Sequence, residues 1–365
     1  MADSTADRLR LIRSEGVGPV TYRRLLARYG SAAAALDALP QLARAGGRAA
    51  APIIPPAADI TRELAAIDRI GATLLLLDTP GYPDLLAELP DAPPALLVLG
   101  DVACLNARAV AIVGSRNASA NGQRLAETIA GALAQAGIAV VSGLARGIDT
   151  AAHRGALAQG RTIACIAGGL DVPYPEENAA LQAAIARNGA VVTEAPLGTA
   201  PLARHFPRRN RLIAGLTLGT LVVEAAIRSG SLITARMALE ANREVFAIPT
   251  SPLDPRGRGG NGLIRAGEAR LVETAEDILA DLPTGPRIRG FAEPPPPALD
   301  FPPADQQAAT AQILGLLSPD PTPVDDLIRR CQFSASAVAS VLMDLELAGR
   351  IETLPGNRVA LLVDA

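Results

Sequence analysis

Six short apolar segments recur between alanine-rich stretches in the middle of the chain. They read AVAIVGS, IAVVSGL, TIACIAGG, AVVTEA, TLVVEA and EVFAIP, and glycine, proline or polar residues bound each one. The stretches between them, such as 122–136 and 148–159, have the spacing of apolar residues that is typical of helices. Near-continuous apolar strands that alternate with helices are typical of a parallel sheet covered on both faces. The sequence therefore predicts a Rossmann-like, doubly wound, mostly parallel α/β sheet.

The N-terminal part of the chain has a different pattern, and we expect a separate domain there. Residues 1–70 read as short helices, with apolar residues three and four apart on both sides of Gly16-Val17-Gly18-Pro19. The two glycines let the backbone turn tightly, and the proline starts the second helix. This resembles a SAM or helix-hairpin-helix module, whose turn amides can touch a nucleic-acid backbone. A plain pair of packed helices has the same pattern.

The remaining boundaries follow from composition. Two short apolar segments around a proline-rich loop lead into the sheet, so that residues 71–282 form the predicted Rossmann-like domain. Residues 283–304 are rich in proline and predict an extended linker. Residues 305–365 read as three helices and a hairpin, a winged-helix pattern. Its third helix has no cation between residues 334 and 348, so we expect this module to bind a protein or nothing rather than duplex DNA.

The cationic residues are concentrated in the middle of the chain. All 34 are arginine; a coding bias explains this most simply, but each cation is then a planar group suited to bidentate phosphate contacts. Residues 1–107 carry 10 arginines and 12 acidic residues, residues 108–270 carry 18 and 11, and residues 271–365 carry 6 and 14. The net charges are therefore −2, +7 and −8, in total −3. A basic middle between acidic flanks indicates a polyanionic partner for the middle domain.

Cysteine and histidine are too few and too dispersed for a disulfide framework or an ordinary zinc site. Cys104, Cys165 and Cys331 have no metal-ligand spacing, and the chain has two histidines. The N-terminal segment MADSTADRLRLIRSEG is charged and lacks an apolar signal core, and the longest apolar runs are too short to span a bilayer. We therefore expect a cytoplasmic protein with no metal, no cofactor and no membrane contact.

The residues that follow the predicted strands share one chemistry. In a doubly wound sheet, ligands bind beyond the carboxyl ends of the strands. Glycines, hydroxyls and arginines recur there, in GSR, SGLARGIDTAAH, GGLDVPYPEEN, EAPLGTAPLARHFPRRNR and EAAIRSGSLITAR. Small residues let backbone amides approach an anion, and helix N-termini add positive potential. The convergence of five loops on one edge predicts a phosphate-binding rim.

Catalytic patterns are weaker at this edge. The G-x-G-x-x-G fingerprint is absent after the first strand, and so is a P-loop lysine. Ser142, Asp149 and His153 are the residue types of a triad, but no nucleophile-elbow context surrounds them. Asp149 is equally a helix cap or an arginine partner, and His153 is equally a core histidine. Three carboxylates either coordinate a metal ion or hold arginines in place, of which we favour the second: Asp171, Glu194 and Glu224.

The ordered motifs of the middle domain resemble those of one family. AIVGSR, SGLARGIDTAAHRGAL, TIACIAGGLDVPYPEEN, EAPLGTAPLARHFPRRNRLIAGL, VVEAAIRSGSLITARMALE and REVFAIPTSPLDPRGRGGNGLIRAG occur in this order between residues 109 and 267. Together they resemble the DprA/Smf family of DNA-processing proteins, and six ordered motifs do not easily coincide by chance. The N-terminal helical segment and the C-terminal winged-helix segment also resemble modules of that family.

The resemblance implies a bacterial protein that binds and protects single-stranded DNA in natural transformation. It also implies loading of the RecA recombinase onto that DNA, including strands covered by single-strand-binding protein, by a homodimer with no established catalytic activity. By motif position, the DNA-binding residues are Ser115, Arg116, Gly143, Arg146, Phe206, Arg208, Arg209, Asn210 and Arg211. Phe206 either stacks on a base or packs in the core. We expect binding that is independent of base sequence and steeply dependent on salt.

The chain departs from the family pattern in two loops. The family often has a basic residue in YPEENAAL, where this chain has Glu176 and Glu177, which puts a DNA contact from that loop in doubt. Thr250 stands where a glycine is usual, in IPTSPLDPRGRGG. We expect Arg256 and Arg258 of that loop to be solvated rather than bound to DNA.

Two other functions stay open at the level of sequence. A nucleotide-processing enzyme of the same fold would hold a nucleoside monophosphate at this edge, with Glu224 as general base. A scaffolding protein would act through its acidic C-terminal module.

Overall fold

The chain folds into two compact units. The computed structural model describes residues 3–45, 51–283, 303–354 and 356–362. One unit consists of residues 63–89 and 95–285, and the other of residues 1–62, 90–94 and 286–365. Most of the predicted proline-rich linker, residues 284–302, lies outside the described part of the chain.

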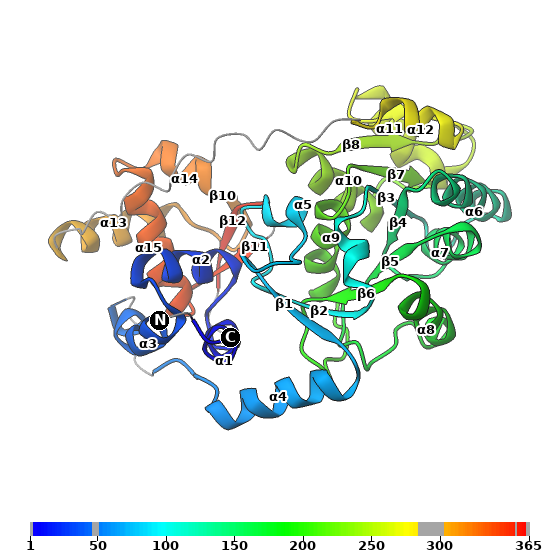
Figure 1. Ribbon diagram of the computed structural model, residues 1–365. Coiled ribbons are helices and arrows are strands. Elements are labelled where there is room, and N and C mark those ends of the chain that lie inside the picture. The colour runs from blue at the N-terminus through cyan, green and yellow to red at the C-terminus, as the bar shows by residue number, and fades with distance from the viewer. Residues whose placement is uncertain (1–2, 46–50, 284–302, 355, 363–365) are drawn as a thin grey trace. The chain divides into compact units, whose positions relative to one another are not determined.

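The first unit is built on a nine-stranded sheet (Figure 1). The strand order is β1-β2-β6-β5-β4-β3-β7-β8-β9. The strands are β1 (Thr73–Leu76), β2 (Ala95–Gly100), β3 (Ala109–Gly114), β4 (Ala139–Ser142), β5 (Thr162–Cys165), β6 (Ala190–Thr193), β7 (Gly219–Val223), β8 (Glu244–Ala247) and β9 (Arg270–Leu271). The six predicted strands, β3 to β8, pair in parallel, which confirms the Rossmann-like fold. Strands β1 and β2 extend the same sheet in antiparallel pairing next to β6.

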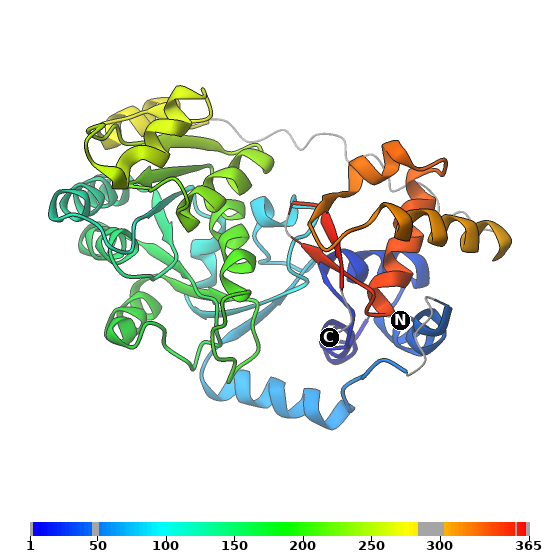
Figure 2. The same ribbon diagram turned by 180° about the vertical axis from the view of Figure 1, so that it is seen from behind.

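Helices cover both faces of this sheet (Figures 1 and 2). Helices α6 and α7 pack against each other on one face, and α9 and α10 pack together on the other. The helices of the unit are α4 (Ala57–Arg69, which begins in the other unit), α5 (Asp84–Ala87), α6 (Ala120–Gln135), α7 (Ile148–Gln159), α8 (Ala179–Asn188), α9 (His205–Gly215), α10 (Gly230–Glu240), α11 (Arg258–Arg265) and α12 (Ala275–Asp281). Short 3₁₀ turns are η1 (Val102–Asn106), η2 (Glu176–Asn178) and η3 (Pro255–Gly257).

The central strands are buried because aliphatic side chains on both faces contact helices. Ile112 of β3 and Leu221 and Val223 of β7 share a core with Ile129 of α6 and Ile148 of α7. All residues of β7 and all but the last of β3 are buried, so both faces are covered. This explains why the strands read as near-continuous apolar runs rather than as alternating patterns. It also fixes the positions of the loops that follow the strands.

The second unit combines the N-terminal helices with the C-terminal module. Helices α1 (Thr5–Ile12), α2 (Pro19–Tyr29) and α3 (Ala32–Ala45) form the N-terminal helical module, hereafter residues 3–45. The C-terminal module, residues 303–362, contains α13 (Pro303–Leu316), β10 (Thr322–Pro323), α14 (Val324–Arg330), α15 (Ala335–Leu347), β11 (Ile351–Leu354) and β12 (Arg358–Leu361). Its three strands pair antiparallel in the order β10-β12-β11. Three helices and this small sheet confirm the predicted winged helix.

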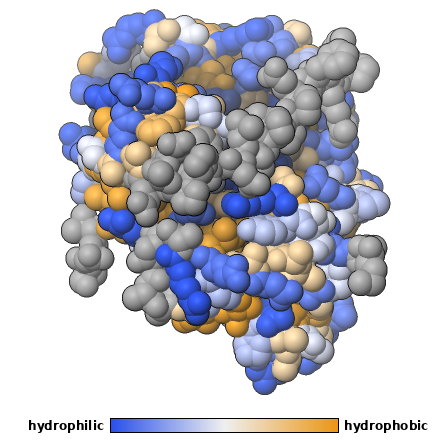
Figure 3. Space-filling view, turned by 90° about the vertical axis from the view of Figure 1, so that its left-hand side faces the viewer, coloured by the Kyte–Doolittle hydropathy of each residue, from blue (hydrophilic) through white to orange (hydrophobic). Residues whose placement is uncertain are grey.

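No helix in the described ranges is both long and apolar enough to cross a membrane. On the face drawn in Figure 3, hydrophilic residues are interspersed with hydrophobic ones.

Candidate nucleic-acid interface

A pocket of about 450 Å³ opens beyond the carboxyl ends of β3, β4 and β5. This is where a doubly wound sheet is expected to hold a ligand, and the volume lies in the range of small-molecule sites. Arg116 follows β3, residues 143–146 follow β4, residues 166–168 follow β5, and α9 closes the remaining side. Five of the nine residues predicted from the sequence line this pocket: Arg116, Gly143, Arg146, Phe206 and Arg209.

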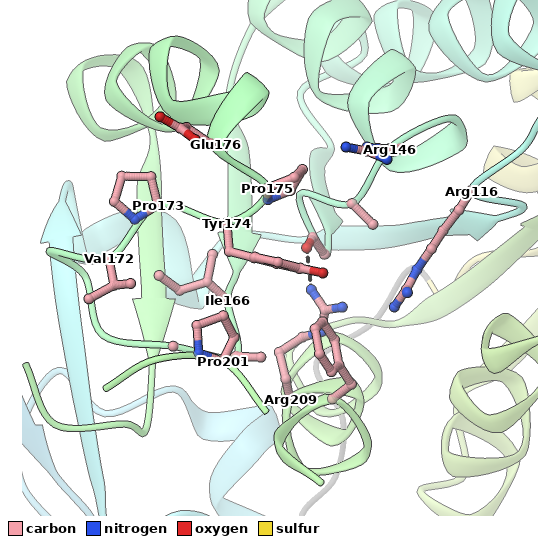
Figure 4. A pocket seen from close by; sticks show the side chains of 15 residues that line it. Arg116, Arg146, Ile166, Val172, Pro173, Tyr174, Pro175, Glu176, Pro201 and Arg209 are labelled. Carbon is pink, nitrogen blue, oxygen red and sulfur yellow. Dashed lines mark hydrogen bonds between the residues drawn. The ribbon is translucent and has the colours of Figure 1, made fainter. Parts of the chain in front are cut away.

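Arg209 forms the floor of the pocket and is itself buried, with 5% of its surface exposed. Its guanidinium donates to the carbonyl oxygen of Gly143 (Figure 4). It also donates to the carbonyl oxygen of Cys165 at 2.8 Å, and so joins α9 to the ends of β4 and β5. A Cβ atom at position 143 would overlap the guanidinium, which explains the glycine. Burial lowers the pKa of Arg209, while the nearby carboxylate of Asp149 raises it. The side chain therefore acts as a charged internal brace.

Asp149 holds the loop after β4 from the other side. This carboxylate, at the first turn of α7, accepts hydrogen bonds from the backbone N–H groups of Gly143 and Ala145, each at 3.2 Å. Burial raises the pKa of Asp149, and the charge of Arg209 opposes that shift. Of the two alternatives for Asp149, the arginine partner describes its electrostatic contact with Arg209. The helix cap does not, because α7 has no side-chain cap and Asp149 bonds to the loop before it.

Aromatic rings and guanidinium groups meet at the mouth of the pocket. The ring centroids of Phe206 and Tyr174 are 5.8 Å apart in an edge-on arrangement. The guanidinium carbons of Arg116 and Arg209 lie 5.1 and 5.7 Å from the Phe206 centroid, within the range of cation–π contacts. Phe206 is half-buried, so it packs within this cluster, whereas Tyr174 is 50% exposed. Tyr174 is thus the more accessible of the two rings.

The rim of the pocket carries cations on one side and apolar residues on the other. In Figure 4, Arg116 and Arg146 lie on one side, Val172 and Pro173 on the opposite side, and Tyr174 between them. The Arg146 Nε atom donates to Glu177 at 2.8 Å, and both side chains are more than half exposed. An ion pair so exposed is weak, and a phosphate can take the place of its carboxylate. Glu177, in the loop whose DNA contact the sequence put in doubt, therefore competes with a phosphate for Arg146.

The other four predicted residues do not line the pocket. The hydroxyl of Ser115 accepts from the backbone of Asn117, and Arg208 is exposed. Asn210 is buried and accepts from Arg209 at 3.3 Å. Arg211 is 5% exposed and paired with Glu194.

The expectation that residues 208–211 would face one ligand together is thereby corrected. Successive residues of a helix point in directions about 100° apart, and α9 contains all four of these residues. Only Arg209 of the four points into the pocket lining. Glu194 holds an arginine, as favoured from the sequence, but the arginine is Arg211 inside the fold.

Two residue types of a catalytic triad, Ser142 and His153, donate their hydrogen bonds to groups outside the triad. Ser142 donates to the carbonyl of Ile112 at 2.7 Å. The hydroxyl of Thr162 donates to Val140, so the Nδ1–H of His153, 2.8 Å away, donates to that hydroxyl. Burial and the charge of Arg209 lower the pKa of His153 to about 3. His153 is therefore a neutral core histidine.

The hydrogen bonds of Glu224 and Asp171 go to Ser119 and Gly198 rather than to arginines. The hydrogen bond with Asp254 and, to a smaller extent, the charge of Glu224 raise the pKa of Arg256. Glu224 accepts from the backbone N–H of Ser119, at 2.8 Å, and from its hydroxyl, and so fixes the start of α6. Asp171 accepts from the N–H of Gly198 at 2.8 Å. Across the described residues, no group of three or more histidine, cysteine, aspartate or glutamate side chains is placed to hold a metal ion.

Residues 250–262, predicted as a loop, comprise a short loop, η3 and the start of α11, and none of them lines the pocket. Arg256 pairs with Asp254 at 2.8 Å, and this hydrogen bond lowers the pKa of Asp254. Thr250 contacts Asn261, whose side chain donates to the Thr250 carbonyl.

Sequence reasoning missed Tyr174 as a site residue. It lies in the quoted motif GGLDVPYPEEN, between two prolines, in a chain with only 4 tyrosines. An aromatic residue between two prolines, in a loop that follows a predicted strand, is the feature of the sequence that could have indicated it.

Comparison with known proteins places the chain in one family. The model of the DNA recombination-mediator protein A family matches residues 73–283, more than half of the chain. The chain belongs to the DprA/Smf family. Residues 2–66 match the DprA-like N-terminal HHH domain, and residues 293–357 match the DprA winged helix domain.

Individual relatives in the DprA/Smf family cover most of the chain. Protein Smf of Escherichia coli is 40% identical over 84% of this chain and 82% of that protein. DNA processing protein DprA of Streptococcus pneumoniae is 48% identical over 55% of this chain and 71% of that protein. A crystal structure of the S. pneumoniae protein superimposes with a TM-score of 0.67 at 35% identity, covering 78% of this chain and 100% of that one.

A second solved DprA structure comes from a relative whose description names its ligand. DNA processing protein A of Helicobacter pylori was solved to describe its single-stranded-DNA binding mode. It superimposes with a TM-score of 0.52 at 29% identity, covering 58% of this chain and 97% of that one.

Proposed function

We propose that this protein binds single-stranded DNA in the pocket between α9 and the carboxyl ends of β3 to β5, without sequence specificity. The observation that carries the proposal is the pairing of two exposed arginines, Arg116 and Arg146, with the exposed ring of Tyr174 around one pocket. Single strands offer phosphates and unpaired bases together, and duplexes do not. The DprA fold, with a relative solved for its single-strand binding, supports the assignment.

Each group has a definite task in this proposal. Arg116 and Arg146 hold phosphates, and Tyr174 stacks on a base. Stacking accepts any base because every base has a π-face. The net charge of +7 over residues 108–270 attracts the strand. Arg209 and Phe206 keep the pocket in shape. The predicted residues outside the lining are assigned no contact with the strand in this proposal: Ser115, Arg208, Asn210 and Arg211.

The binding experiment is an anisotropy titration with oligo-dT of about 20 nucleotides at several salt concentrations. We expect the logarithm of affinity to fall linearly with the logarithm of salt concentration, because phosphate contacts release counterions. Arg116→Ala and Arg146→Ala should each weaken binding and flatten this slope. Arg124→Ala is the matched control, since it removes another exposed arginine, on α6, that does not line the pocket. Affinity that is independent of salt would refute the proposal. Equal losses of affinity in all three variants would show that the binding site is not this pocket.

We further propose that the bound strand is passed to the RecA recombinase and that the working form is a homodimer. The family description as a recombination mediator supports a role in strand transfer. Single strands coated with single-strand-binding protein are mixed with RecA, and filament formation is followed with and without this protein. Faster filament formation is the expected result, and Arg116→Ala should abolish it. Sedimentation equilibrium of the free protein measures its molar mass, for which we expect twice that of one chain.

We propose no catalytic step. The carboxylate considered as a general base, Glu224, is engaged by Ser119 at the start of α6. Incubation with nucleoside monophosphates followed by chromatography should leave them unchanged.

A further inference from the structure

Helix α15 of the winged helix belongs to two hydrophobic cores at once. Val338, Val341 and Leu345 face the core of the winged helix itself. Met343 and Leu347 are buried in the core of the N-terminal helical module, with Leu11, Tyr22, Leu25 and Leu39 among others. Helix α15 contacts both α2 and α3 (Figure 1). The helix that normally reads a DNA groove is therefore covered on one side by a different module.

The glycine-rich turn between α1 and α2 sits directly against the end of α15. Gly16 has a φ of +78°, and a Cβ atom there would come within 3.1 Å of the Leu347 Cα and 3.2 Å of the Glu346 carbonyl oxygen. A Cβ atom on Gly18 would lie 3.1 Å from the Glu346 Oε1 atom. Glycine at both positions permits this close approach. The turn that a helix-hairpin-helix module would present to nucleic acid is thus occupied by protein.

The occupying group is a carboxylate. The hydroxyl of Thr21 donates to Glu346 Oε2. The N-terminus of α2 is capped by Gly18, which offers no side-chain acceptor, and backbone N–H groups at such a terminus attract anions. Burial raises the pKa of Glu346, whereas its hydrogen bonds and the charge of Arg24 lower it. Arg24 also donates to the Ala339 carbonyl at 2.7 Å, which binds α2 to α15 a second time.

The two modules have complementary charge. Residues 3–45 contain seven arginines and four acidic residues, a net charge of +3. Residues 303–362 contain four arginines and seven acidic residues, a net charge of −3. The acidic C-terminal module therefore covers a surface of the basic N-terminal module that a polyanion could otherwise bind.

We propose that the segment from Gly16 to Arg24 is a second nucleic-acid backbone site, and that Glu346 of the docked winged helix occupies and masks it. A phosphodiester and the Glu346 carboxylate carry the same charge and compete for the turn, Thr21 and Arg24. Undocking exchanges one anion for the other, so nucleic-acid binding at this turn and docking of α15 exclude each other. By linkage, whatever draws the winged helix away strengthens nucleic-acid binding at the turn by the same factor. This site is separate from the pocket of the sheet and does not depend on it.

The test uses the full chain and a labelled duplex of about 20 base pairs, which has no unpaired bases for stacking. Glu346→Arg places a cation beside Arg24 and should undock the winged helix. We expect duplex affinity to rise roughly fivefold or more, within the range of typical coupling free energies. Amide hydrogen exchange should increase at residues 16–24 and in α15. Glu346→Gln, which keeps the shape and removes the charge, should change both quantities in the same direction by less.

Three controls separate unmasking from a change in charge. Asp325→Arg makes the same charge change at an exposed position of the same module and should leave duplex affinity near that of the wild type. Adding Arg24→Ala to Glu346→Arg should remove the gain, whereas adding Arg44→Ala, an exposed arginine of α3, should not. Circular dichroism checks that each variant is folded. If Glu346→Arg unfolds, the duplex affinity and hydrogen exchange of Glu346→Gln provide the test instead. The proposal fails if exchange increases without a gain in duplex affinity, or if Asp325→Arg gives an equal gain.

Discussion

Replacing Arg209 by methionine tests whether the floor of the pocket is a structural brace. Methionine keeps much of the volume of the side chain but removes the charge. The substitution leaves the carbonyls of Gly143 and Cys165 without this donor, and the buried carboxylate of Asp149 without its opposing charge.

The expected cost is large because the pair is buried. Arg209 is 5% exposed and Asp149 is 6% exposed. Arg209 and Asp149 interact electrostatically, and leaving a buried charge uncompensated costs about 3–5 kcal/mol in the free energy of unfolding. A domain of this size loses about 2–4 °C of Tm per kcal/mol, so Tm should fall by roughly 6–20 °C. Differential scanning calorimetry measures this, with exposed Arg116→Ala as the control, for which we expect less than about 0.5 kcal/mol.

The cost should depend on pH in a defined direction. Burial already raises the folded-state pKa of Asp149 above its unfolded value, and loss of Arg209 raises it further. A carboxyl group with a raised pKa binds more protons in the folded state, so lowering the pH through that pKa stabilises the fold. The Tm deficit of Arg209→Met should therefore be larger at about pH 8 than at about pH 5.

A second substitution sharpens the test. Asp149→Asn removes the stranded charge, so adding it to Arg209→Met should recover part of the lost Tm. A deficit no larger than that of Arg116→Ala, or one that grows toward acidic pH, would refute the account of Arg209 as a brace for Asp149.

Three smaller changes test neighbouring parts of the unit. Tyr174→Ala should weaken oligo-dT binding by about 1–3 kcal/mol, and Tyr174→Phe should not, because only the ring face is needed; equal losses in both would argue against stacking. Glu177→Gln should strengthen oligo-dT binding by up to about fivefold, since it frees Arg146 from an exposed ion pair; weaker binding would show that Glu177 supports the site. Ser119→Ala removes the cap of α6 and a donor to Glu224, and urea titration should show a loss of about 0.5–2 kcal/mol; an unchanged midpoint would count against the cap.

The sheet and the convergence of its loops follow from local sequence patterns. Strands buried on both faces must be apolar throughout, so the six segments from β3 to β8 stand out without any knowledge of contacts. Once parallel pairing is assumed, Arg116, Gly143 and Arg146 must meet at one edge. That geometry follows from the order of strands and helices alone.

The directions of side chains on α9 and the pairing of the two end modules depend on tertiary contacts. The string RRNR has the same composition whether its arginines point outward or inward, and only the contacts with Glu194 and Gly143 show that Arg211 and Arg209 point inward. Likewise, no sequence pattern around Glu346 predicts its hydrogen bond with Thr21. The charge counts indicated the region that binds an anion, but only the burial of each side chain shows which arginines can contact a ligand there.

The joint core of α15 and the N-terminal helices has a consequence for synthesis of the protein. Thr21 and Glu346, which meet in the folded unit, are 325 positions apart. At ribosomal rates of about 5–20 residues per second, the N-terminal helices wait roughly tens of seconds for the residues that cover Leu11 and Tyr22. During that time the nine-stranded sheet is synthesised and can fold, while an apolar helical face stays uncovered on the nascent chain. A ribosome that stalls before α15 would therefore release a chain with a folded sheet and an exposed apolar surface on the N-terminal helices. We expect chaperones to bind such a chain.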